Sequence, residues 1–149
     1  MITNLEEVRR GHERFLAGNA RLIVDAETIA GRHALTYVQR YSEFTRRSGK
    51  LQDKTAYRIV RTSGGRILRI VNPMAYAAAI DTGSKAHRIT AVNGRALRFT
   101  TRAGVMLFRR SVWHPGTRPY KFLYNATDSA YRVLGQELKR GMGELAQRF

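Results

Sequence analysis

Apolar residues recur at three- and four-residue steps through the first third of the chain, which is the spacing of one face of an α-helix. The stripe runs from Leu5 to Phe44 without a proline. Internal glycines weaken the pattern, since each costs a helix about 1 kcal/mol relative to alanine. Residues 1–48 are therefore predicted to be helical, as one helix or as two divided near Gly18 or Gly31. Such a helix can form a coiled-coil arm or lie across a sheet, and we expect the second.

The pattern then changes to the alternation that is typical of β-strands. Segments 56–61 and 66–71 flank Thr-Ser-Gly-Gly and predict a hairpin. Asn72 is expected to cap a short helix near residues 73–82, with the following proline in its first turn and Gly83 at its end.

Three more strands are expected over residues 87–90, 96–101 and 105–113, separated by glycine-containing turns. Two prolines and a glycine should make the loop over residues 114–119 rigid. An amphipathic helix closes the chain over residues 120–149 and is expected to fray at its Gly-Met-Gly.

These elements predict an α+β fold in one domain, residues 1–149, because a chain of this length can bury a sufficient core. The domain comprises an N-terminal helical region (1–48), a sheet region (49–119) and a C-terminal helix (120–149). The sheet is expected to be antiparallel, with about four to five strands and the short inserted helix, and to carry the C-terminal helix.

The charge balance is unusual. Lys and Arg total 27 against 11 acids, a net charge of +16, and 22 of the basic residues are arginine. Between Lys54 and Thr127 the only carboxylate is Asp81. Such a field attracts nucleic acid, an anionic membrane face or an acidic protein surface, and the arginine fork pairs with carboxylates as well as phosphates. The simplest alternative is a solvated basic surface.

Several classes of site are not expected. The chain has no cysteine, no apolar run of the roughly 20 residues a membrane helix needs, and no signal-peptide pattern at its start, so we expect a protein made inside the cell, without a membrane partner. The four histidines lack metal-ligand spacing, and Asp81-Thr82-Gly83 lacks the second carboxylate of an aspartic protease. No catalytic residue, metal or cofactor is therefore predicted, and the chain is not expected to be an enzyme.

Three motifs occur in order in the second half: Ala75-Tyr76 through Gly83-Ser84, then Ala96-Leu97-Arg98-Phe99, then His114-Pro115-Gly116-Thr117-Arg118-Pro119-Tyr120-Lys121-Phe122-Leu123. They resemble the tail-completion (minor tail, head–tail joining) family of tailed bacteriophages and prophages, whose members show Y-A-x-x-V-E-x-G-T, A-L-x-F and H-P-G-T-x-P-x-P-F-L. The chain departs from this pattern at Asp81, where glutamate is commoner, and at Lys121, where proline often stands.

The resemblance implies a structural virion protein that is assembled in the bacterial host cytoplasm and located in the neck of the virion. Its partners would be copies of itself in a ring, often a hexamer, the neighbouring stopper or adaptor and tail tube proteins, and double-stranded DNA passing through the channel. A closed ring needs two different complementary patches on each subunit. The proline loop and the alanine-rich helix are expected to supply part of them, although both could instead pack inside the subunit.

Two sets of candidate residues follow. The expected subunit interface comprises Tyr76, Asp81, Gly83, His114, Pro115, Gly116, Thr117, Pro119 and Phe122. Arginines on or beside one predicted hairpin are expected to face either DNA or an acidic partner: Arg95, Arg98, Arg102, Arg109 and Arg110. The main alternative function is a stand-alone basic module that binds nucleic acid without sequence preference, and a nuclease-like enzyme is the weakest alternative.

Overall fold

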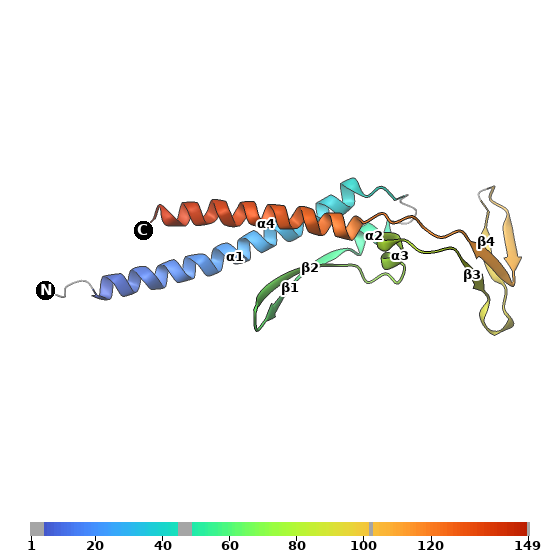
Figure 1. Cartoon of the computed structure of the whole chain (residues 1–149), viewed down its shortest axis with the longest axis horizontal. Helices are drawn as coiled ribbons and strands as arrows, with labels where there is room; N and C mark the ends of the chain where they lie inside the picture. Colours follow the sequence, from blue (N-terminus) through green and yellow to red (C-terminus); the bar gives the residue numbers. More distant parts are fainter. Residues whose placement is uncertain (1–4, 45–48, 102, 149) are drawn as a thin grey trace. The chain divides into compact units, whose positions relative to one another are not determined.

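The computed structural model describes residues 5–44, 49–101 and 103–148, and their fold is α+β, as predicted. A long N-terminal helix, two short α-helices, a C-terminal helix and small antiparallel sheets make up these residues (Figure 1). The described residues form two compact units. Unit 1 comprises the chain up to Ala75 together with the segment from Phe122 onward, and unit 2 is Tyr76–Lys121.

Unit 1 is built on two long helices that run antiparallel to each other (Figure 1). Helix α1 spans Leu5–Tyr41 without a break, which decides between the one-helix and two-helix predictions, and α4 spans Phe122–Ala146. Gly18 of α1 faces Leu145 of α4, and Gly141 faces Leu22. Helix α4 therefore continues through Gly141 and Gly143, where the sequence predicted fraying, because packing against α1 outweighs the low helix propensity of glycine.

Small side chains line the contact side of both helices. Completely or almost completely buried alanines occur at four-residue steps, which place them on one face of each helix. They are Ala26, Ala30 and Ala34 of α1 and Ala126 and Ala130 of α4. Alanine side chains allow two helix backbones to approach closely, so these residues form the closely packed side of each helix.

A β-hairpin packs against α1. Strands β1 (Ala56–Thr62) and β2 (Gly65–Val71) pair antiparallel with Thr62 opposite Gly65, so the predicted hairpin is confirmed. The Tyr57 ring lies directly over Gly31, where any side chain would overlap it. Arg66 donates to both carboxylate oxygens of the buried Glu27, with Nε–Oε distances of 2.9 and 2.7 Å. One face of the hairpin is thus held on α1, and α4 contacts β2.

Asn72 does not cap the short helix, contrary to the sequence prediction. Its side-chain amide donates to the Leu51 carbonyl and to Thr55 Oγ1, at 2.6 and 2.8 Å, and its Oδ1 accepts from the Met74 N–H. These contacts close a local turn and tie the chain to α2 (Lys50–Asp53), so the amide is used before the helix begins. Helix α3 starts only at Ala77 and spans Ala77–Thr82.

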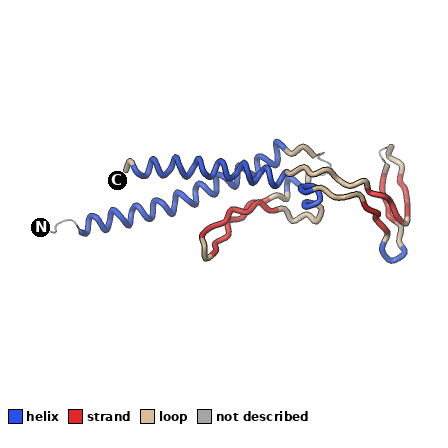
Figure 2. The backbone as a smooth tube through the Cα atoms, in the orientation of Figure 1, coloured by secondary structure: helices blue, strands red, loops and turns tan. Residues whose placement is uncertain are grey.

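Unit 2 is a long two-stranded ribbon that leaves α3 and returns to it (Figure 2). Strand β3 (His87–Thr90) pairs with β6 (Ser111–His114), and β4 (Leu97–Thr100) pairs with β5 (Met106–Arg109). The short 3-10 helix η1 (Val92–Gly94) interrupts only one arm, between β3 and β4. The described strands form three two-stranded sheets, β1–β2 in unit 1 and β3–β6 and β4–β5 in unit 2, whereas the sequence suggested one sheet of about four to five strands.

Candidate protein–protein and polyanion interface

The base of the ribbon is a close contact between two glycines and the backbone opposite each. Gly83 has φ +80°, and a Cβ there would lie 2.8 Å from the Thr117 carbonyl oxygen. Gly116 has φ +92°, and its Cβ would overlap the Ser84 carbonyl oxygen. Ser84 and Thr117 exchange both backbone hydrogen bonds, at 2.9 and 3.0 Å. Three predicted interface residues, Gly83, Gly116 and Thr117, thus meet inside one subunit, where they fix the shape of the loop.

The rest of the loop is anchored to the end of α3. The N–H groups of Tyr120 and Lys121 donate to the carbonyls of Ile80 and Asp81, at 3.0 and 2.9 Å. These bonds satisfy carbonyls at a helix end that would otherwise lack partners. The Arg118 guanidinium lies 4.7 Å from the centre of the Tyr120 ring, within cation–π range. The loop is therefore a pre-shaped surface element, as its proline and glycine content predicted.

Two histidines stack across the ribbon beside this loop. The rings of His87 and His114 are 5.1 Å apart between centroids. His114 Nδ1 accepts from the Gly116 N–H at 3.1 Å, and His87 Nδ1 lies 2.9 Å from the Lys85 carbonyl oxygen. His114, a predicted interface residue, is half-buried and positions the glycine turn.

The remaining predicted interface residues differ in exposure. Tyr76 is 42% exposed, Pro115 and Pro119 are also exposed, and Asp81 is half-buried. Phe122 is only 2% exposed, and its ring packs edge-to-face on Phe44 with centroids 5.2 Å apart. Phe122 is therefore a core residue of unit 1, since the subunit itself covers it.

The predicted arginines do lie on or beside one hairpin, but they do not share a face. Arg98 is opposite Phe108, and Arg109 is opposite Leu97 in the next register position, so their side chains project from opposite faces of β4–β5. Arg95 and Arg110 flank the strands, and all four side chains are exposed. Arg102 lies outside the described residues. The ribbon consequently carries positive charge on both sides.

Large apolar side chains on the same ribbon face solvent as well. They include Trp113 (66% exposed), Phe108 (57%), Val105, Met106, Phe99 and Ile89. An isolated two-stranded ribbon is at best marginally stable in water, and exposed aromatic residues interleaved with arginines are typical of protein interfaces. In unit 2 the one buried apolar residue in the described part is Ala77.

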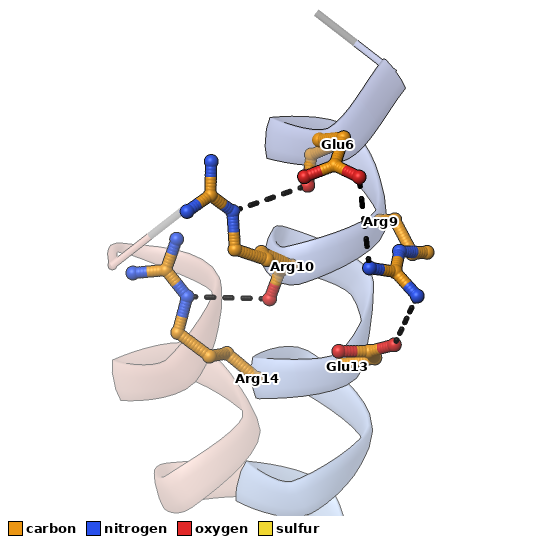
Figure 3. Close-up of polar contacts among 5 residues, drawn as sticks. All are labelled: Glu6, Arg9, Arg10, Glu13 and Arg14. Carbon is orange, nitrogen blue, oxygen red and sulfur yellow. Dashed lines mark hydrogen bonds and ion pairs between the residues drawn. The ribbon is translucent and has the colours of Figure 1, made fainter.

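The few carboxylates of the chain are mostly engaged within the helices. In the first turns of α1, Arg9 pairs with Glu6 and Glu13 at 4.0 and 3.8 Å, while Arg10 and Arg14 donate to backbone carbonyls one turn earlier (Figure 3). In α4, Asp128 pairs with Arg132 at 2.9 Å, and Arg140 lies between Glu137 and Glu144. Hydrogen bonding to Glu137 raises the pKa of Arg140. Unit 2, by contrast, has nine Lys or Arg residues and one acid.

One serine–histidine contact was not visible in the sequence, because its residues are 96 positions apart. His33 Nε2 and Ser129 Oγ are 2.8 Å apart, beside a shallow hollow of about 270 Å³ that Tyr37 and Asp128 also line. A nucleophile needs an oriented base and donors for an oxyanion. Ser129 lies in the middle of α4, where backbone N–H groups are used by the helix, and Asp128 pairs with Arg132. The contact therefore links the two helices and does not assemble a hydrolytic site.

Two further findings concern metal ions and membranes. Within residues 5–44, 49–101 and 103–148, no three His, Asp or Glu side chains gather as metal ligands would. No helix in that part of the chain combines the length and apolar character needed to cross a membrane.

No protein-family model matches this chain, and neither a curated protein nor a solved structure matches it.

Proposed function

We propose that this chain is a non-enzymatic structural subunit of a bacteriophage neck, acting as a tail-completion or tail-terminator protein that joins the tail tube to the DNA-filled head. In this proposal it is located in the virion and forms a ring of identical copies that contacts neighbouring neck and tail tube proteins. The observation that carries the proposal is the exposed apolar and cationic surface of unit 2. Its ribbon exposes Trp113 and Phe108, lacks a core of its own, and has nine cationic residues against one acid.

The loop that closes the ribbon supports the same proposal. A loop already held by the Ser84–Thr117 bridge and by Gly83 and Gly116 loses little conformational entropy on docking. The exposed Pro115 and Pro119 next to it are available to a neighbouring subunit. The ordered motifs of this region carry the resemblance to the tail-completion family, and that family forms rings.

The decisive experiment is genetic and structural. A phage whose copy of this gene is deleted should yield filled heads and tails that fail to join, and a plasmid-borne copy should restore infectious particles. Trp113→Ser should fail to complement, whereas Tyr124→Ser should complement. Both side chains are 66% exposed, but Tyr124 belongs to α4 of unit 1. Normal joined particles in the deletion strain would refute the proposal.

A stand-alone nucleic-acid-binding module remains the second candidate, because arginines project from both faces of the ribbon. Such a module should bind duplex DNA in isolation, with affinity that falls steeply as salt is raised. A neck subunit should instead form rings with its tail tube partner, which negative-stain imaging of the mixture would reveal.

A further inference from the structure

The hairpin of unit 1 has one covered face and one open face. Tyr57, Leu68 and Arg66 project toward the face that packs on α1. The alternate residues, Arg58 on β1 and Arg69 on β2, are directly opposite each other on the open face, and both are exposed. Their Cα atoms are therefore only about 4.5–5.5 Å apart.

The two arginines of this open face have no hydrogen-bond or ion-pair partner among the described residues. Like charges directly opposite each other destabilise an antiparallel pair. On the covered face, by contrast, an arginine has an acidic partner. There Glu27, only 4% exposed, accepts two hydrogen bonds from Arg66, and this bonding raises the pKa of the guanidinium. Arg58 and Arg69 on the open face lack a carboxylate of this kind in the part of the chain that the structure describes.

A second copy of the chain is poorly suited to supply that partner. Six of its acids are already in ion pairs, and Glu43, Asp53 and Asp81 also have interactions of their own. In the described part only Glu7 and Asp25 lack a partner. With a net charge of +16, the chain attracts an acidic partner to this face more strongly than a second copy of itself.

We propose that Arg58 and Arg69 form a clamp for carboxylates on a different, acidic protein that docks on the open face of the β1–β2 hairpin. Apolar side chains alternate with the arginines on this face: Val60 and Val71 are half-buried and Ile67 is 37% exposed. Arginine among apolar residues is the composition of a protein interface, whereas contact with a phosphate backbone is wet and strongly polar. The apolar neighbours also lower the local dielectric and so strengthen the charge pairing.

The experiment compares two double variants of the full chain. Arg58→Gln/Arg69→Gln removes the clamp. Arg32→Gln/Arg40→Gln removes two exposed charges from α1 in the same unit and serves as the control. Binding of a fluorescent oligoglutamate peptide, and separately of a short DNA duplex of equal charge, is measured by anisotropy at physiological salt.

The clamp variant should bind oligoglutamate about tenfold more weakly, because each lost hydrogen bond joins two charged groups. The control variant should lose less than about threefold, since its charges act only through the general field. The clamp variant should melt at the same temperature or higher, because a like-charge pair has been removed. That result would separate lost binding from lost folding.

Two outcomes would overturn the proposal. Equal losses in both variants would show that only net charge matters. A loss confined to the DNA duplex would assign the face to nucleic acid. Neither outcome depends on the neck function, because the measurement uses the free protein and residues outside unit 2.

Discussion

The two units of this protein differ in whether they have an apolar core. Unit 1 has one: alanines between α1 and α4, Leu68 of the hairpin and Phe122 are all at most 8% exposed, although Val8 and Tyr124 face solvent. Unit 2 leaves Trp113, Phe108 and Val105 more than half exposed. Because burial of apolar surface is the main stabilising contribution to folding, unit 1 has the means to be stable alone and unit 2 does not. We therefore expect unit 1 to provide most of the stability of the free protein and unit 2 to gain stability on docking.

The strongest test of this comparison removes one aromatic side chain from each unit. Phe122→Ala leaves a cavity against Phe44 and should lower the free energy of unfolding by about 3–5 kcal/mol. Trp113→Ala should change it by less than about 0.5 kcal/mol, because the ring is already in solvent. Urea titrations followed by circular dichroism measure both. A large loss for Trp113→Ala would mean that the ribbon is buried in the free protein.

A second prediction concerns two glycines of the same helix. Gly31→Ala should destabilise unit 1 by about 1–3 kcal/mol, because the new methyl group overlaps the Tyr57 ring. Gly11→Ala has open space around it and should stabilise the protein by up to about 1 kcal/mol through helix propensity. Thermal unfolding of both variants is the measurement. Stabilisation by Gly31→Ala would contradict the close contact between α1 and β1.

A third prediction separates the units. Gly116→Ala places a side chain at φ +92° and against the Ser84 carbonyl, so it should distort the base of the ribbon. Amide chemical shifts should move throughout residues 84–90 and 111–117 of unit 2. The melting temperature of the helices should stay within about 2 °C of the parent, because the distorted residues belong to unit 2. A large fall in helix stability would show that the units fold together.

The smallest expected effect lies at the start of α1. Arg9→Gln removes ion pairs to Glu6 and Glu13 that are long and exposed, with Arg9 at 65% exposure (Figure 3). Surface pairs of this kind contribute about 0–1 kcal/mol, so the change in unfolding free energy should be close to the error of measurement. A loss above about 1 kcal/mol would indicate that this end of the helix is covered by another molecule in solution.

Local signals in the sequence predicted most of the elements. The helical stripe, the Thr-Ser-Gly-Gly hairpin and the glycine at the end of α3 each depend on residues close together in the chain, and all three are confirmed. Contacts between distant residues were not predictable. Asn72 bonds to Leu51 instead of capping a helix, and Leu22 and Leu145 hold α4 together past its glycines.

The candidate site shows the same limit. Loop chemistry correctly indicated a rigid turn at residues 114–119, but not that Gly116 lies against Ser84, or that Thr117 lies against Gly83, across the ribbon. Phe122 could not be distinguished from an exposed anchor without knowing that Phe44 covers it. The pairing of Arg58 opposite Arg69 could have been predicted from the sequence, because a two-residue turn between Thr62 and Gly65 fixes the hairpin register.

The glycine contact at the base of the ribbon restricts how this chain can diverge. Where two backbones touch, there is no side chain to exchange for a compensating one, so neither Gly83 nor Gly116 can be replaced and rescued by a second change nearby. Most side chains of the strands beyond that contact are exposed and have no such restriction. Substitutions can therefore accumulate along the outer ribbon while its attachment point stays the same.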